Sequence, residues 1–299
     1  MKYTRREIGK FALLAPLAAL APRGLSAAAK PNSKFAGVQL GMNVPYNFGG
    51  RDMDPDELLQ RCLQLNVSAL ELRSQPVETF LGSPAAGGKQ ASADVLRKWR
   101  ATVSMDRVKE FRRKYEDAGV QIDIVKYDGI YTMSDDEVDY CFNLAKALGA
   151  QALSTEIAEE GPKRIGQFAD KHKMKVGYHG HGATKPEHWE TAFTYSKYNW
   201  ANLDLGHFLA GNDTSPIPFL KKYHDRITHL HVKDRKLKDG PNMPFGEGDT
   251  PIKEALHLLR DNKWPIDAVI EFEYPVPEGS DRMKELARCV QYCKAALLA

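Results

Sequence analysis

The chain has 299 residues, of which 42% are hydrophobic and 27% are charged, and its formal net charge is +3. This is the composition of an ordinary globular protein, long enough for one large α/β domain or two smaller ones. Residues 1–30 hold six Lys and Arg against a single Glu, a local charge of +5, so the remainder carries about −2. The overall charge therefore gives no support to a nucleic-acid-binding protein.

The N-terminal segment has the three parts of a bacterial export signal. The charged stretch Thr4–Lys10 contains two adjacent arginines, and the apolar stretch Phe11–Leu20 and small residues at Ser26–Ala29 follow it. The apolar part is too short to span a membrane comfortably, and paired arginines are typical of twin-arginine export. We predict a twin-arginine signal peptide over residues 1–30 and an exported, periplasmic protein that is not anchored to the membrane after cleavage. The alternative is an amphipathic N-terminal helix.

The four cysteines predict neither a zinc site nor a disulfide framework. Cys62, Cys141, Cys289 and Cys293 include no C-x-x-C pair and no zinc spacing. Cys289 and Cys293 lie four residues apart on an expected helix, where a disulfide would be awkward even in an oxidising compartment. We therefore expect buried free thiols.

From residue 35 onward, short apolar strands alternate with helical patterns. This alternation predicts right-handed βαβ units, and eight of them suit an α/β fold of the (β/α)8 TIM-barrel type, a single domain over residues 31–299. An open doubly wound sheet is the alternative, but no glycine-rich phosphate-binding turn follows the first strand. The expected strands are Val38–Met42, Ala69–Arg73, Gln121–Lys126, Ala152–Ile157, Lys175–His179, Ala201–Leu205, Ile227–Val232 and Ala268–Phe272. The expected helices are one that begins after Asp54, Met105–Ala118, one from Ser134 towards Leu148, Gly161–His172, Ile217–His224, Ile252–Asn262 and Asp281–Leu298.

Polar side chains gather at the carboxyl ends of the last five expected strands. Because the active sites of TIM barrels lie at this end, these carboxylates and imidazoles should converge on one small space. Clustered carboxylates repel one another unless a cation joins them or their pKa values rise. Mixed Glu, Asp and His ligands suit Mn²⁺, Fe²⁺, Co²⁺ or Zn²⁺, and suit Mg²⁺ less well. The polar residues concerned are Glu156, His179, His181, Asp204, His207, His229, His231, Lys233, Asp234, Glu271 and Glu273.

Several of these residues also have a purely structural interpretation. A single His at a strand end is most often a hydrogen-bonded structural residue, and we adopt this interpretation for His229. Glu273 is explained equally well as a metal ligand and as a group beside the ligands or at the surface. His207 could cap the following helix. Lys233 could instead pair with Asp234 or Glu247 in a structural salt bridge. A metal site nevertheless explains better why five successive strands all end in Glu, His or Asp.

The order of these motifs resembles a known superfamily. Asp204-Leu-Gly-His207, His231-Val-Lys-Asp234, Gly246-Glu-Gly-Asp249 and Ile270-Glu271 resemble the xylose isomerase-like barrels. That group comprises sugar phosphate isomerases and epimerases, inosose dehydratases and metal-dependent apurinic-site DNA endonucleases. The resemblance covers residues 35 to 298, is strongest after residue 150, and implies a divalent cation held by side chains of the last four barrel strands.

Carried over position by position, the resemblance assigns Asp204, His231 and Glu271 as metal ligands. Many relatives have Glu where this chain has His179, which costs the site a negative charge, and Glu156 is placed to restore it as a further ligand. The sequence leaves open whether His179 or His181 touches the metal. By position we assign His179 as the ligand and His181 as a proton-transfer residue. His207 and Lys233 are candidates for binding or protonating substrate oxygens.

A divalent cation chelated by two sugar oxygens acidifies the neighbouring C–H and stabilises the enediolate that a base then generates. This chemistry predicts a metal-dependent isomerase or epimerase. Because sugar phosphates are cytoplasmic, export favours a small, non-phosphorylated sugar or keto-sugar as substrate. A lyase or dehydratase on a keto-sugar, keto-glycoside or inosose is the alternative, since loss of a β-hydroxyl starts from the same enediolate.

Two other classes of function remain. A DNA nuclease on this scaffold needs three clustered metals and a basic groove, whereas Arg73 and Lys126 stand where extra histidines would be expected. We therefore expect no nucleic-acid partner. A carbohydrate-binding protein without catalysis is a further alternative, which the complete ligand set argues against. Barrels of this group often pair, so a homodimer is possible.

Overall fold

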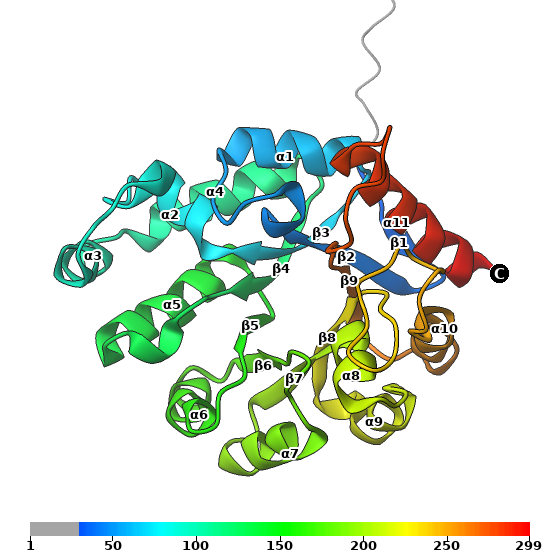
Figure 1. Ribbon diagram of the computed structural model, residues 1–299. Helices are drawn as coiled ribbons and strands as arrows, with labels where there is room; N and C mark the ends of the chain where they lie inside the picture. Colours follow the sequence, from blue (N-terminus) through cyan, green and yellow to red (C-terminus); the bar gives the residue numbers. More distant parts are fainter. Residues whose placement is uncertain (1–29) are drawn as a thin grey trace, which may run out of the picture. The chain divides into compact units, whose positions relative to one another are not determined.

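Eight parallel strands, β2 to β9, close into a barrel in the computed structural model, which describes residues 30–299 (Figure 1). Neighbouring strands pair in chain order, and the pairing of β2 with β9 closes the sheet. This confirms the predicted single-domain TIM barrel. Except for Lys30, the predicted signal peptide lies outside the described residues.

All eight predicted strands are present, with ends that differ by at most two residues from those expected. One short strand is additional, because β1 pairs antiparallel with the start of β2. The strands are β1 (Lys34–Phe35), β2 (Val38–Val44), β3 (Ala69–Arg73), β4 (Gln121–Lys126), β5 (Ala152–Glu156), β6 (Lys175–His179), β7 (Asn199–Asp204), β8 (Ile227–Val232) and β9 (Asp267–Ile270).

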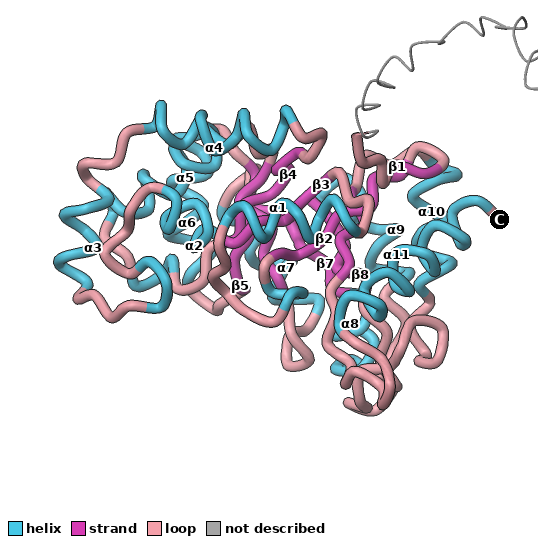
Figure 2. The backbone as a smooth tube through the Cα atoms, turned by 90° about the horizontal axis from the view of Figure 1, so that it is seen from above, coloured by secondary structure: helices cyan, strands magenta, loops and turns pink. Residues whose placement is uncertain are grey.

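The helices surround the strands, as the views in Figures 1 and 2 show. The seven predicted helices are present, and four more occur, namely α2, α3, α7 and α8. No helix within residues 30–299 is long and apolar enough to cross a membrane. The helices are α1 (Pro55–Gln64), α2 (Ser74–Phe80), α3 (Ala93–Arg100), α4 (Met105–Asp117), α5 (Asp135–Leu148), α6 (Gly161–His172), α7 (Pro186–Tyr195), α8 (Leu205–Asn212), α9 (Ile217–Tyr223), α10 (Ile252–Asn262) and α11 (Arg282–Leu298).

The two faces of the strands differ in chemistry. Side chains alternate along a strand, so every second residue points away from the barrel axis towards the helices. These outward residues, such as Leu70, Leu72 and Leu230, belong to the large apolar core. Inside the barrel, Ile124, Ala152 and Val269 form a separate apolar cluster. Many of the other inward positions are polar, such as Glu71 and His231, so the barrel interior can hold a charged site.

The four cysteines are buried and free, as predicted. Burial raises the pKa of the Cys62 and Cys141 thiols above their ordinary range. A thiol that stays protonated is a poor nucleophile and a poor metal ligand. The chemistry of the site must therefore come from its carboxylates, imidazoles and amines.

Candidate active site

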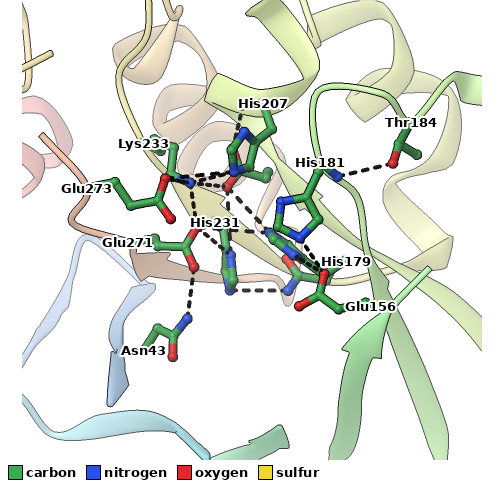
Figure 3. A network of polar contacts seen from close by, with 12 residues as sticks. Asn43, Glu156, His179, His181, Thr184, His207, His231, Lys233, Glu271 and Glu273 are labelled. Carbon is green, nitrogen blue, oxygen red and sulfur yellow. Dashed lines mark hydrogen bonds and ion pairs between the residues drawn. The ribbon is translucent and has the colours of Figure 1, made fainter. Parts of the chain in front are cut away.

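The residues predicted for the site lie together at the carboxyl ends of five neighbouring strands. Figure 3 shows Glu156, His179, His231 and Glu271 around one space. Asp204, the last residue of β7, lies within 4.0 Å of His179 and His231. Four of the five predicted metal ligands are almost fully buried, with exposed fractions of 3% or less: His179, Asp204, His231 and Glu271.

One polar atom from each of these four residues faces the same space. Nε2 of His179 lies 3.5 Å from Oδ2 of Asp204 and 4.0 Å from Oε2 of Glu271. Nδ1 of His231 lies 3.8 Å from the same Asp204 oxygen and 3.3 Å from the same Glu271 oxygen. All four atoms are buried, and the two imidazole nitrogens have no hydrogen-bond partner among the described residues. The two carboxylate oxygens have an ion-pair partner only, the ammonium of Lys233.

The other polar atom of each ligand candidate is held by a neighbour, which fixes its orientation. His231 donates from Nε2 to Glu71 at 2.5 Å, and His179 donates from Nδ1 to Glu156 at 2.8 Å. In Asp204, Oδ1 accepts the backbone N–H of His207 at 2.7 Å and thereby caps α8.

Glu271 follows the same pattern. Its Oε1 accepts a hydrogen bond from the side-chain amide of Asn43 at 2.9 Å, while Oε2 faces the shared space. Metal-binding His and carboxylate side chains are typically held in this way by partners outside the ligand set.

Two imidazole nitrogens and two carboxylate oxygens, all buried and turned towards one space, fit a divalent transition metal. Their separations of 3.3 to 4.0 Å suit ligands that each lie about 2.0–2.2 Å from one ion. The nitrogen share of the set favours Mn²⁺, Fe²⁺, Co²⁺ or Zn²⁺ over Mg²⁺.

Without an ion, a proton compensates part of the charge. Burial disfavours the imidazolium form, but the carboxylates of Glu271 and Glu71 outweigh it and raise the pKa of His231 to about 10. Similarly, although burial opposes it, the charges of His231 and Lys233 hold the pKa of Glu271 well below its ordinary value. Metal binding must therefore displace a proton from His231.

Lys233 is an internal cation beside the ligand candidates. Its ammonium lies 2.7 Å from Glu271, 2.7 Å from Glu273 and 3.3 Å from Asp204. Burial would lower the pKa of this amine, but the three carboxylates raise it above the ordinary value. Lys233 is thus a fixed positive charge, and the alternative of a salt bridge with Asp234 is wrong. Asp234 instead accepts backbone N–H groups of Gly246, Gly248 and Thr250.

His207 also lies within reach of the ligand space. Both of its ring nitrogens are occupied, since Nε2 lies 2.8 Å from the amine of Lys233 and Nδ1 lies 3.0 Å from the guanidinium of Arg235. Burial and the neighbouring Lys233 charge lower the pKa of His207 to about 4. The ring is therefore neutral near pH 7. It does not cap α8, because its backbone N–H is itself capped by Asp204.

Glu156 and His181 form a pair at the mouth of the site. Glu156 accepts from Nε2 of His181 at 2.7 Å through the same oxygen that binds His179, and its other oxygen lies 2.8 Å from Lys126. Glu156 thus faces the nitrogen of His179 that points away from the shared space of the four ligand atoms. The His181 side chain is 57% exposed, and its hydrogen bond with Glu156 raises its pKa despite partial burial.

Two residues that support this site were not predicted from the sequence, namely Glu71 and Asn43. Glu71 lies in the middle of β3 and is fully buried against His231 and His229. His229 itself is buried, with its pKa lowered to about 4 by burial, in keeping with the structural interpretation. Glu71 could have been noticed in the sequence, because it lies between two leucines in a strand that is buried on both faces. A carboxylate buried in this way needs a partner.

The fold places this chain among the TIM barrels, and sequence comparison identifies its family. The xylose isomerase-like TIM barrel profile matches residues 89–293. This chain therefore belongs to that family.

Individual relatives are distant. An inosose dehydratase of Clostridium botulinum is 33% identical over 160 residues, which cover 46% of this chain and 53% of that protein. The chain thus spans about half the length of the curated relatives that it matches. A xylose isomerase domain protein from Planctomyces limnophilus has a TM-score of 0.61 at 14% identity, covering 89% of this chain and 98% of the other.

A second structure of similar fold is D-psicose 3-epimerase with D-tagatose from Clostridium cellulolyticum. Its TM-score is also 0.61, at 12% identity, and the match covers 87% of this chain and 99% of the epimerase. At these identities the structural matches establish the shared barrel fold.

Proposed function

We propose that this protein is a metal-dependent isomerase or epimerase of a small, non-phosphorylated sugar or keto-sugar. The observation that carries the proposal is the convergence of four buried ligand atoms, from His179, Asp204, His231 and Glu271. A divalent cation held there would polarise the carbonyl of a chelating substrate and acidify the adjacent C–H bond. Glu156 is then a positioning residue for His179 rather than a fifth ligand.

His181 is the residue best placed to move the substrate proton. It is the exposed imidazole of the cluster, and Glu156 both orients its ring and favours its protonated form. A neutral His181 accepts the proton from the substrate carbon, and the resulting imidazolium is stabilised by the Glu156 carboxylate. Return of the proton to the neighbouring carbon gives an isomer, and return to the opposite face gives an epimer.

Lys233 and His207 have less access to substrate. Lys233 is 1% exposed and His207 is 9% exposed, and each is already in contact with other polar groups. We assign Lys233 the role of balancing the carboxylates and His207 that of a neutral hydrogen-bonding group above the site. Both roles preserve the charge of the ligand set while substrate binds.

A lyase is the second candidate, and the partial match to inosose dehydratases favours it. The same proton abstraction, followed by departure of a hydroxyl from the next carbon, would dehydrate a keto-sugar, keto-glycoside or inosose. His181, protonated in the first step, can return its proton to the leaving oxygen.

We also propose export by the twin-arginine route, for which the support is the leader sequence alone. Replacement of Arg5 and Arg6 by lysine should leave the full chain in the cytoplasmic fraction of a bacterial host. Periplasmic recovery of that variant would contradict the proposal and remove the argument for a non-phosphorylated substrate.

Metal analysis followed by proton NMR in D₂O tests the enzymatic proposal. Purified protein loaded with Mn²⁺ or Co²⁺ is incubated with ketoses, keto-glycosides and inosose. Deuterium at a carbon beside the carbonyl is expected, with an isomer, an epimer or a dehydrated product. Glu271→Gln should lower metal content and abolish exchange, whereas Glu285→Gln, which alters another buried carboxylate away from the site, should do neither. Protein that binds no divalent metal, or exchanges no substrate proton, overturns the proposal.

A further inference from the structure

A cavity of about 490 Å³ opens beside the ligand candidates, on the side of β2 and β9. Its polar lining includes Tyr46, Arg51, Asn242, Glu273 and Arg282. Glu273 connects this cavity to the site, because its Oε2 lies 2.7 Å from the Lys233 ammonium, which in turn lies 2.7 Å from Glu271. The cavity therefore borders the charged cluster that surrounds the ligand atoms.

The one carboxylate in the cavity lining is already compensated. Glu273 accepts a hydrogen bond from the hydroxyl of Tyr46 at 2.6 Å and a longer one from Asn242 at 3.3 Å. Together with the Lys233 ammonium at 2.7 Å, these contacts give both oxygens of Glu273 a partner. Glu273 therefore does not need either arginine of the lining as a partner.

Arg282 presents a fixed guanidinium to the cavity. The group lies over the ring of Phe272, 5.0 Å from the ring centroid, and donates one hydrogen bond to the backbone oxygen of Asn47. Gly49, with φ of 101°, packs against it, and a Cβ there would lie 3.6 Å from Nε. Nε and Nη2 of Arg282 have no hydrogen-bond partner among residues 30–299.

Arg51 supplies a second cation at the rim. Its side chain is 71% exposed, and its nearest carboxylate, Asp128, is 3.9 Å away. Asp128 is itself paired with the buried Arg73. Arg51 is thus free to turn its guanidinium towards a group that enters the cavity.

We propose that Arg51 and Arg282 form a subsite for an anionic group on the substrate. The inference rests on the proposed function and narrows its substrate class to sugars that carry a negative charge away from the reacting carbonyl. A guanidinium binds carboxylate or phosphate oxygens through two parallel hydrogen bonds, which favours arginine for this task. Since the proposed substrate is not phosphorylated, we expect the carboxylate of a sugar acid.

The test compares three ketoses that differ only at carbon 6: D-fructose, D-fructuronate and D-fructose 6-phosphate. Solvent deuterium exchange by the metal-loaded enzyme gives KM for each, and calorimetry gives binding without turnover. The acid should have a KM at least about tenfold below that of D-fructose, since a charged hydrogen bond is lost with the neutral sugar. Preference for the 6-phosphate would support the anion subsite with phosphate as its source, and would overturn the non-phosphorylated substrate.

Arginine variants separate the subsite from the catalytic centre. Arg51→Gln changes an exposed side chain and should fold normally, and Arg51→Gln combined with Arg282→Gln should remove the preference for the acid. Arg112→Gln on α4, at the opposite end of the barrel near Gly149, is the matched control and should retain the preference. Equal KM and affinity for the acid and D-fructose, or a preference that survives in the double variant, overturns the subsite. Preferential binding of the acid without any exchange would support the subsite and overturn the proposed reaction.

Discussion

Glu71 is the residue whose replacement most directly tests how the metal site is built. Its carboxylate accepts the Nε2 proton of His231 at 2.5 Å, and both side chains are fully buried. In Glu71→Gln the amide oxygen can still accept this hydrogen bond, so the change removes mainly the negative charge. Loss of such a partner of a metal-binding His typically lowers metal affinity 10- to 100-fold, or by about 1.4–2.7 kcal/mol.

Calorimetric titration of Co²⁺ or Mn²⁺ into the metal-stripped protein measures this loss. The matched control is Glu285→Gln, because Glu285 is equally buried but bonds to Tyr274 and Ser280 instead of a ligand candidate. We expect Glu71→Gln to bind metal about tenfold or more weakly and the control to bind as the wild type does. Wild-type affinity in a folded Glu71→Gln protein would refute the assignment of His231 as a ligand oriented by Glu71.

Three further predictions concern the ion, Lys233 and His181. Mn²⁺ or Co²⁺ at about 100 times its Kd should add about 2.7 kcal/mol to the free energy of unfolding and roughly 5–10 °C to Tm. A Tm that does not change when metal is added would contradict the metal site. Lys233→Met removes the ammonium that lies 2.7 Å from Glu271. The metal-free variant should therefore lose about 3–5 kcal/mol of stability, and metal should raise its Tm by more than it raises the wild-type Tm. Equal increases in Tm would argue that Lys233 does not compensate the carboxylate charge. The hydrogen bond with Glu156 raises the pKa of His181. Because the base must be neutral, kcat/KM should rise with pH and then level off, with the midpoint of the rise above the ordinary histidine pKa of about 6.5. His181→Asn should abolish that rising limb, and an unaltered pH profile would assign the proton transfer elsewhere.

The barrel could be predicted because its outer face obeys simple rules. Parallel strands buried on both sides give short apolar runs, and the intervening helices carry apolar stripes with clear caps, such as Asp54 and Ser134. Helix α8 was missed for the converse reason. It starts directly at Asp204 without a loop, and six of its eight residues are buried, so hydrophobicity does not mark where β7 ends.

The site was predictable only where it reaches the ends of the strands. Asp204, His231 and Glu271 occupy positions where a barrel is expected to place polar groups, so their types and order indicate a metal. The role of Glu156 depends on which nitrogen of His179 it faces, a matter of ring orientation that spacing does not encode. Glu71 lies too deep in its strand to be recognised without knowing that His231 stands across the barrel, 160 residues away in sequence.

The charges inside the barrel give an independent argument for the ion. Two buried lysines face five carboxylates there, which leaves a net charge of −3 if the imidazoles are neutral. These are Lys126 and Lys233 against Glu71, Glu156, Asp204, Glu271 and Glu273. A divalent cation would reduce the imbalance to −1, and a protonated His181 would remove it. Because unpaired buried charge is costly, this imbalance favours the binding of a cation. Without a metal ion, Glu271 and Glu71 raise the pKa of His231 to about 10, and the proton on His231 supplies part of the compensation.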